Sequence, residues 1–562
     1  MRIDLILLDA PPSNVPFHWS LGEVHHAALQ TLSLVELTRR VTAAARAAAV
    51  LYWDAALGAP DPQTVMRTAA LPGTLWHAGL RLGTGGQPRI IDHILPLWML
   101  NADPDAGIET TSWRLSLRAC LIPTAALRHL GGIHAGFETP TAAALDLGFR
   151  AVSAGMVPRH IPSLLPSGIT AAGREPHDLP LEDELLFARR NFKTWQYFWG
   201  ALRIFSAGSQ RVSALKPILA TLRSASGSAV TPYPHPEMSS QTDAFSAAPS
   251  ARITVLIPTI DRYPYLRTLL AQFRTQTLPP HEIIIVDQTE PERRDSKLVA
   301  DFPDLPIRLF VMDQAGQCRS RNLGLQESTG DYIMFLDDDV EIPPDLLEKH
   351  LENLQRFRAD VSSGSVFEPP QTPQECQKDR IRASDVFPTN ITLIRREILK
   401  NSGLFDLAFD HRSRADHDLG TRIYLSGGVM MMDERTPILH HHAPRGGLRT
   451  HGARVVTGVS SRRSIFQRNL ITASSHYIGL RYFSEAHTRE QALLSVLMTT
   501  RSEGNFAMKL IRLLVAVIQF VDTRKKLNAN LREAKAMMAE YPQIPVLKRG
   551  PDGGFRSEDQ SE

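Results

Sequence analysis

The stretch Asp331–Pro344, DYIMFLDDDVEIPP, is the segment around which the rest of the chain is organised. The apolar run at residues 332–336 predicts a short strand buried on both faces, as in parallel sheets. It ends in three consecutive carboxylates, Asp337, Asp338 and Asp339, of which the first and third point to one side of an extended chain. Two hard oxygen ligands at the end of a buried strand suit Mg²⁺ or Mn²⁺. The stretch therefore predicts either a metal site or a solvated acidic turn.

Length and composition narrow the class of protein. The chain has 562 residues, of which 43% are apolar and 22% charged, enough to form several buried cores. A net charge of +3 indicates no nucleic-acid partner. The three cysteines lack metal or disulfide spacing, and neither a signal peptide nor an apolar run of about 20 residues is apparent. We therefore expect a cytoplasmic protein.

Two α/β regions are predicted on either side of a linker. Residues 1–222 alternate strand-like runs with Ala/Leu-rich helical stretches, and residues 223–251, rich in Ser, Pro and Ala, predict a flexible linker. Residues 252–455 form the second α/β region, whose strand–helix–strand order favours a mainly parallel sheet. Residues 456–548 are expected to be helical and residues 549–562 to be a disordered tail.

Polar side chains follow three of the predicted strands of the second region. Thr259 ends the run ITVLIPT, Asp287 ends IIIVD, and the acidic triplet ends the run at 332–336. Ligands of parallel α/β sheets bind at the carboxyl ends of the strands. This common placement favours a binding site over a chance acidic turn.

Six motifs of the second region resemble a known family in identity and order: ITVLIPTIDR (253–262), IIIVDQT (283–289), AGQCRSRNLG (315–324), FLDDDV (335–340), TNITLIRREILKNSGLFD (389–406) and RADHDLGTRIYLSGG (414–428). Together they resemble the catalytic domain of a family 2 glycosyltransferase with the GT-A fold, over about residues 252–445. The resemblance implies an enzyme that moves a sugar, with inversion, from a nucleoside-diphosphate donor to a hydroxyl acceptor with the help of a divalent metal.

The resemblance also implies roles for residues of the donor site. Thr259 and Asp287 should meet the nucleoside, or else serve as a strand cap and a turn carboxylate. Gly316 and Arg321 should line the donor pocket. Asp337 and Asp338 are placed with the donor, and Asp339 is placed as a metal ligand.

The acceptor side of the reaction is expected at the segment RADHDLGTR. The resemblance puts Asp416 in the position of the catalytic base, which must take the proton of the attacking hydroxyl. Ala415 stands where the family usually has Glu, a departure that weakens the motif. Asp418 and Arg422, four residues apart on a predicted helix, are expected to form a structural pair.

Three consecutive histidines, His440, His441 and His442, follow a further predicted strand. Many relatives have one metal-binding histidine here, and imidazole suits Mn²⁺ better than Mg²⁺. In an extended strand, His440 and His442 share one face and His441 the other. The family's H-x-x-P pattern favours His441 as the metal ligand, with a structural role as the alternative.

The N-terminal region repeats part of the second region. Residues 121–138 align without gaps to residues 393–410, an offset of 272 (393 − 121), and residues 52–60 align to 335–343, an offset of 283 (335 − 52). Ala55, Ala56 and Ala144 then stand where the second region has Asp338, Asp339 and Asp416. We interpret residues 1–222 as a degenerate, inactive glycosyltransferase-like domain that packs on the active copy or binds the acceptor. The alignment also puts Asp9 at the place of Asp287, which predicts that the first strand and helix are missing.

The predicted architecture is thus two tandem GT-A-like, Rossmann-like domains, each with a helical tail. The acceptor would be a glycan, a lipid-linked molecule or a protein, in cell-surface polysaccharide or glycoconjugate synthesis by analogy. Residues 508–527 are amphipathic with cationic flanks, which indicates packing on the catalytic domain or peripheral contact with the inner face of the membrane. Two alternatives stay open: a nucleotidyltransferase, which would need a Gly-rich loop where this chain has PTIDRYP, and a non-catalytic nucleotide-sugar-binding protein.

Overall fold

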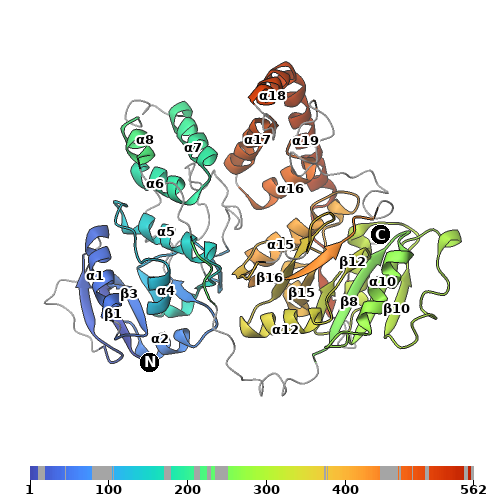
Figure 1. Ribbon diagram of the computed structural model, residues 1–562, viewed down its shortest axis with the longest axis horizontal. Coiled ribbons are helices and arrows are strands. Elements are labelled where there is room, and N and C mark those ends of the chain that lie inside the picture. Colours follow the sequence, from blue (N-terminus) through green and yellow to red (C-terminus); the bar gives the residue numbers. More distant parts are fainter. Residues whose placement is uncertain are drawn as a thin grey trace.

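A computed structural model describes residues 1–9, 19–28, 30–44, 46–78, 104–105, 107–169, 179–207, 215–223, 230–234, 251–372, 375, 378–443, 466, 470–483, 485–499, 506–549 and 555–557. In Figure 1 the chain forms two α/β lobes, side by side, each with a group of helices above its sheet. Within the predicted linker, residues 230–234 lie against the first lobe, where the Tyr233 amide donates to the Ala154 carbonyl at 2.7 Å. Most of the linker prediction falls outside the described residues.

The second lobe is built on a nine-stranded sheet of order β10-β9-β8-β11-β15-β13-β16-β12, in which β14 also pairs with β16. Its strands are β8 (Ile253–Thr259), β9 (Glu282–Asp287), β10 (Ile307–Val311), β11 (Tyr332–Phe335), β12 (Val340–Glu341), β13 (Val361–Phe367), β14 (Ile381–Ala383), β15 (Thr392–Arg395) and β16 (Met430–His440). Strands β8, β9, β10 and β11 run parallel to one another. In contrast, β15 runs antiparallel to its neighbours β11 and β13. The predicted α/β class is confirmed.

Helices on both sides of this sheet cover its buried strands. They include α10 (Tyr263–Phe273), α11 (Gln317–Glu327), α12 (Leu346–Arg356) and α15 (Ala415–Leu425). In α10 the predicted stripe of Leu266, Leu269, Leu270 and Phe273 is buried, because residues at this spacing share one helical face. Every residue of β9 is buried, as expected for a strand covered on both faces.

The first lobe has a seven-stranded sheet of order β2-β1-β3-β6-β4-β7-β5. Its strands are β1 (Ile3–Leu8), β2 (Val24–Ala27), β3 (Ala49–Asp54), β4 (Leu75–Ala78), β5 (Thr110–Thr111), β6 (Ala119–Pro123) and β7 (Pro158–His160), and its helices include α1 (Thr31–Ala43), α2 (Pro62–Ala69), α4 (Thr124–His129) and α5 (Pro140–Ser153). A parallel pair of strands, β1 and β3, is followed by antiparallel β6. The same arrangement joins β8, β11 and β15 in the second lobe.

The strand registers of the two sheets match the sequence offsets. Leu51 faces Leu121 in the first lobe, and Met334 faces Leu393 in the second. Pro158 and Met430, which differ by 272, also occupy matching positions beside β4 and β13. Each lobe therefore pairs its aligned strands in the same way.

The prediction that the first lobe lacks the first strand is wrong. Ile6 of β1 faces Tyr52 of β3, just as Leu256 of β8 faces Phe335 of β11. Asp9, three residues past Ile6, thus takes the place of Thr259 and not that of Asp287. The misassignment arose because an isolated apolar run carries no information about which neighbour it pairs with.

A helical tail follows each sheet. The first tail contains α6 (Leu181–Asn191), α7 (Thr194–Ala207) and α8 (Leu215–Leu222), and the second contains α16 (Ala473–Tyr482), α17 (Glu485–Thr499), α18 (Phe506–Ile518) and α19 (Phe520–Glu540). Strand β17 (Leu547–Arg549) then pairs with β18 (Phe555–Ser557), and most of the predicted tail, residues 549–562, lies outside the described residues. Among the described residues, no helix is long and apolar enough to cross a membrane.

The two lobes touch through equivalent residues. A Cβ atom on Gly155 would lie 2.7 Å from the Ile381 carbonyl oxygen, and one on Gly427 would lie 2.8 Å from the Glu109 carbonyl oxygen. Gly155 and Gly427 differ by 272, and so do Glu109 and Ile381. The contact therefore has approximate two-fold symmetry.

Candidate functional site

Asp338 is held on both of its oxygens by protein groups. The Thr259 hydroxyl donates to Oδ2 at 2.7 Å, and Nη1 of Arg262 donates to Oδ1 at 3.0 Å. Burial raises the pKa of Asp338 to about 7 despite the opposing charge of Arg262. Through these two hydrogen bonds, Asp338 links the segment after β11 to Thr259 at the end of β8 and to Arg262 just beyond it.

Asp339 is fully buried, yet one of its oxygens accepts no hydrogen bond. Oδ2 accepts from the Ala443 amide at 2.8 Å and lies 3.2 Å from Nη1 of Arg262. Oδ1 lies 3.3 Å from Nε2 of His440. Although burial opposes ionisation, contact with His440 and the charge of Arg262 hold the pKa of Asp339 at about 2. A buried, ionised carboxylate with an unsatisfied oxygen is an environment that suits a cation.

Asp337 points away from Asp338 and pairs with α11. Its Oδ1 accepts from Nη2 of Arg321 at 3.0 Å, and the carboxylate is partly exposed. Arg321 is anchored in turn by the Gln317 carbonyl at 3.1 Å. The structure thus brings two of the predicted donor-site residues, Asp337 and Arg321, into direct contact.

Gly316 precedes α11 and allows a loop of the second lobe to approach that helix. A Cβ atom on Gly316 would lie 2.2 Å from Oδ2 of Asp410. The Asp410 carboxylate accepts from the amides of Cys318 and Arg319 at 2.8 and 3.0 Å, which satisfies the open N–H groups at the start of the helix. Gly316 therefore leaves the space in which the Asp410 side chain approaches the start of α11.

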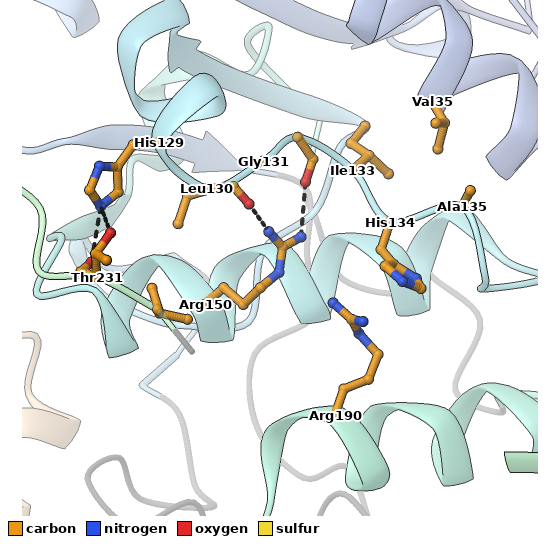
Figure 2. A pocket seen from close by; sticks show the side chains of 12 residues that line it. Val35, His129, Leu130, Gly131, Ile133, His134, Ala135, Arg150, Arg190 and Thr231 are labelled. Atoms are coloured by element: carbon orange, nitrogen blue, oxygen red, sulfur yellow. Dashed lines mark hydrogen bonds between the residues drawn. The ribbon is translucent and has the colours of Figure 1, made fainter. Parts of the chain in front are cut away.

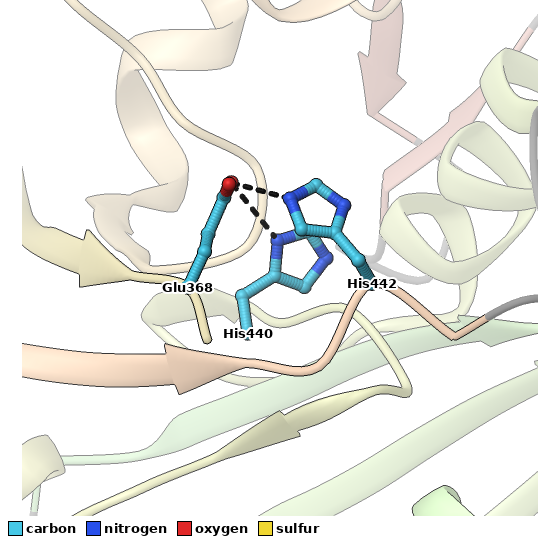
Figure 3. A group of neighbouring side chains, drawn as sticks. All are labelled: Glu368, His440 and His442. Carbon is cyan, nitrogen blue, oxygen red and sulfur yellow. Dashed lines mark ion pairs between the residues drawn. The ribbon is translucent and has the colours of Figure 1, made fainter. Parts of the chain in front are cut away.

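Strand β16 ends at His440, and His441 and His442 follow it, with His442 in the left-handed region of the backbone (φ 51°). The ring centroids of His440 and His442 lie 4.2 Å apart. Figure 3 shows both rings facing Glu368, with Nε2 of His442 at 2.5 Å and Nδ1 of His440 at 3.9 Å from Oε1. His441 instead places Nε2 2.6 Å from Oε1 of Glu341.

Two groups of side chains could hold a metal ion. Ligand atoms of Asp337, Asp339 and His440 lie within 4.8 Å of one another, and so do those of Glu368, His440 and His442. The first group joins both outer carboxylates of the triplet with an imidazole, a donor set that suits Mn²⁺. Among the described residues, His441 belongs to neither group, so the geometry favours His440 in the position that the sequence pattern gave to His441.

Asp287 lies at the end of β9, next to the end of β8. Its carboxylate accepts from the Tyr263 hydroxyl at 2.7 Å and from the Thr289 amide at 2.9 Å. Thr259 faces Asp287 directly across the two strands. The structure thus gathers Thr259, Asp287 and the acidic triplet at one edge of the sheet.

Asp416 lies in the first turn of α15, where it is partly exposed and receives the His417 amide at 2.8 Å. Arg414, the residue before the first residue of α15, has a left-handed backbone (φ 82°). The loop before it reaches α11, because Nε2 of Gln317 donates to the carbonyls of Phe409 and Arg412. Helix α11 thus links the segment of Asp416 to Asp337 through Arg321.

Asp418 and Arg422 form the predicted structural pair. Nε of Arg422 donates to Asp418 at 3.0 Å, and its outer nitrogens donate to the carbonyls of Ser402 and Leu404. Asp146 and Arg150 of the first lobe repeat the pair at 2.8 Å, with the carbonyls of Leu130 and Gly132. The residue numbers of all these partners differ by 272 between the two lobes.

The first lobe has no equivalent of the acidic group in its described residues. Asp54 stands in register with Asp337, but its carboxylate is taken by Arg118 at 2.7 Å and by the Ala56 amide at 2.8 Å. A cavity of about 360 Å³ lies elsewhere in this lobe, between α5 and the turn at residues 129–135. Figure 2 shows Arg190 beside it and Arg150 bonded to the turn. At the equivalent turn of the second lobe, Pro545 accepts a hydrogen bond from Leu404 at 2.7 Å.

Sequence reasoning missed two residues of the site. Arg262 ends the first motif, but nothing in the local pattern shows that it reaches Asp338, 76 residues away. Glu368 follows β13 and meets the histidines only through sheet pairing, so its position in sequence gives no signal.

Comparison with known proteins gives matches in the second lobe. Residues 254–414 match the family model "Glycosyl transferase family 2". The uncharacterized glycosyltransferase YwdF of Bacillus subtilis is 35% identical over 105 residues, 18% of this chain and 38% of that protein. The succinoglycan biosynthesis protein ExoW of Rhizobium meliloti is 31% identical over 121 residues, 21% of this chain and 38% of that protein. This chain thus spans well under half the length of these curated relatives.

Solved structures give weaker likenesses. Residues 1–349 of S. aureus TarS, in complex with UDP-GlcNAc, are 17% identical to this chain with a TM-score of 0.35. The match covers 55% of this chain and 98% of that one. The similarity of the second lobe to glycosyl transferase family 2 therefore rests on the family model over residues 254–414.

Proposed function

We propose that the second lobe, whose residues 254–414 match the family model "Glycosyl transferase family 2", is a glycosyltransferase domain that performs an inverting, metal-dependent transfer. The substrates would be a nucleoside-diphosphate sugar and an acceptor that offers a hydroxyl group. The observation that carries this proposal is the group of Asp337, Asp339 and His440 at the carboxyl end of β11.

In this proposal the acidic edge of the sheet holds the donor. A divalent cation, Mn²⁺ or Mg²⁺, held by Asp337, Asp339 and His440 would stabilise the negative charge of the departing diphosphate. Arg321 contacts Asp337 and adds a fixed positive charge beside it. Thr259 and Asp287 lie at the neighbouring strand ends, where the nucleoside would bind.

The transfer itself would be a single displacement. The acceptor oxygen forms a bond to the anomeric carbon while the bond from that carbon to the diphosphate oxygen breaks. The acceptor proton passes to the carboxylate of Asp416, which is partly exposed at the start of α15 and so accessible. Attack from the face opposite the leaving group inverts the configuration.

Replacement of Asp416 tests this assignment. We expect Asp416→Asn to reduce release of nucleoside diphosphate in a screen of nucleotide-sugars by about 10²-fold or more, because the amide cannot accept the proton. Donor binding, measured by calorimetry, should be retained. Asp313→Asn is the matched control, since that side chain is 94% exposed. Unchanged turnover in Asp416→Asn would refute the role of Asp416.

The two rival functions find less support. A nucleotidyltransferase would need a glycine-rich loop after β8, where this chain has Ile260, Asp261 and Arg262. A non-catalytic binding protein would have no use for a carboxylate at Asp416. The relative from the succinoglycan pathway supports a setting in polysaccharide or glycoconjugate synthesis. The buried, unpaired thiols of Cys120 and Cys318 support a reducing, cytoplasmic location.

For the first lobe, we propose a degenerate copy of the catalytic domain that packs on the active one. The matching strand registers and the repeated pair of Asp146 and Arg150 support common descent. Ala55, Ala56 and Ala144 leave it without ligands or a base. The near-symmetric contact around Gly155 and Gly427 supports a structural role, in which this lobe takes the place of a second subunit.

We also propose that the second helical tail touches a membrane surface. Helix α18 and the start of α19 expose large apolar side chains: Leu510, Ile511, Leu513, Leu514, Val517, Ile518, Phe520 and Val521. Arg512, in the midst of these residues, is buried instead. Exposed cations flank the apolar stretch at Lys509 and at residues 524–526. An apolar helix with cationic ends suits the surface of an anionic bilayer, and would bring a lipid-linked acceptor close to the enzyme.

A further inference from the structure

The side chains of Glu368, His440 and His442 form a group of their own beside the acidic triplet. Their ligand atoms lie within 4.8 Å of one another. Figure 3 shows the carboxylate of Glu368 beside the two rings, which lie where β16 ends. We call these three residues the outer group, and Asp337, Asp339 and His440 the inner group.

The backbone at His442 supports a role for this arrangement. His442 has a φ of 51°, in the left-handed region that residues other than glycine seldom adopt. With that conformation its ring lies beside the ring of His440, at 4.2 Å between centroids, and Nε2 reaches Glu368 at 2.5 Å. Uncommon backbone conformations of this kind concentrate at binding sites, where surrounding contacts hold them.

We propose that the outer group is a second cation site, which prefers Zn²⁺ and similar transition metals. Two imidazoles and one carboxylate are the ligands of many three-residue zinc sites, which leave a fourth position for water. Mg²⁺ prefers oxygen ligands and is a poor match for two nitrogen donors. Glu368 and His442 are each about half exposed, so an ion from solution can reach them.

The outer group and the inner group share His440, so they cannot both bind an ion through this residue at the same time. Nε2 of His440 faces Asp339 at 3.3 Å, and Nδ1 faces Glu368 at 3.9 Å. A neutral imidazole has one nitrogen with a free lone pair, and the other carries a proton. An outer ion on Nδ1 therefore puts the proton on Nε2, which then donates to Asp339 and cannot bind an inner ion. With an inner ion on Nε2, the Nδ1 proton faces Glu368 and orients the ring.

Co²⁺ serves as the probe for the outer group because its visible spectrum reports tetrahedral coordination. We expect the full chain to show intense tetrahedral Co²⁺ bands that Zn²⁺ abolishes. The bands should disappear in His442→Ala and persist in Asp337→Asn. His441→Ala is the matched control, since His441 pairs with Glu341 outside both groups. Bands that survive in His442→Ala, or that Asp337→Asn removes, would overturn the outer site.

The exclusivity rests on the proposed inner metal site and needs its own measurement. We expect saturating Zn²⁺ to weaken Mn²⁺ binding to the full chain, followed by the electron paramagnetic resonance of free Mn²⁺, by about tenfold. In His442→Ala, Zn²⁺ can compete only at the inner group itself, so the Zn²⁺ concentration that halves Mn²⁺ binding should rise by about tenfold. Equal Mn²⁺ binding with and without Zn²⁺ would overturn the exclusivity, whereas no Mn²⁺ binding at all would refute the inner site of the proposed function. The Co²⁺ result is independent of both outcomes.

Discussion

Asp338 and Asp339 are neighbours in the chain but have opposite electrostatic surroundings. Both oxygens of Asp338 are taken by Thr259 and Arg262, and burial raises its pKa to about 7. Asp339 keeps one oxygen without a hydrogen bond, and its pKa is held at about 2. Alternation along an extended chain gives this division of roles in advance, because it turns Asp338 away from its two neighbours. The identity of the anchoring cation, Arg262, could not be predicted, since it depends on how β8 and β11 pair.

Substitution of the two residues should separate their roles. Asp339→Asn should abolish Mn²⁺ binding, because the amide removes a charge that the ion needs. Asp338→Asn should retain Mn²⁺ binding within about tenfold but lower the thermal midpoint, since one of its two hydrogen bonds is lost at a cost of about 1–2 kcal/mol. Titration with Mn²⁺ and a thermal melt of both variants give the comparison. Equal loss of Mn²⁺ binding in both would contradict the assignment.

At the scale of elements, the sequence pattern predicts that the strands and helices of the second lobe exist, but it does not predict the residue at which each strand ends. The buried runs of β8, β9 and β11 follow from their apolar residues, as does the stripe of α10. The choice between His440 and His441 could not be made from sequence, because it depends on where β16 ends and on the left-handed turn at His442. The exposed apolar surface of α18 also needed the structure, since the same residues could equally have formed a core helix.

Helix α18 provides the prediction at this scale. We expect the full chain to bind vesicles of phosphatidylcholine with phosphatidylglycerol, and Val517→Glu to weaken this binding by about tenfold or more, because a charge replaces exposed apolar surface that the bilayer would cover. Leu32→Glu is the control, since Leu32 is 71% exposed on α1 of the other lobe. Sedimentation with vesicles measures the bound fraction. Loss of a dimer in Val517→Glu, without any vesicle binding by the parent chain, would show that a second copy covers the helix instead.

At the scale of the whole molecule, the repeat links sequence to architecture. The gap-free alignment of residues 121–138 with 393–410 predicts that β6 and β15 are equivalent strands, and their registers against β3 and β11 agree with this. The first strand was misjudged, since no aligned residues connect β1 with β8. The symmetric contact between the lobes could not be predicted either. Glycines such as Gly155 and Gly427 are common in turns, so their presence does not indicate a contact with another lobe. It emerges only when both sheets are in place.

The symmetric contact between the lobes predicts that a substitution in one lobe changes the stability of the contact segments in both. Gly155, Gly427 and Gly168 all have positive φ, so Ala at each should cost about 1–2 kcal/mol in backbone strain. At Gly155 and Gly427 the new methyl group also meets the carbonyl oxygens of Ile381 and Glu109, whereas at Gly168 it meets nothing within 4 Å. We therefore expect Gly155→Ala and Gly427→Ala to speed amide exchange at residues 107–111 and 381–383 together. Gly168→Ala should leave both segments unchanged. Faster exchange confined to the lobe that carries the substitution would show that the two lobes do not depend on each other through this contact.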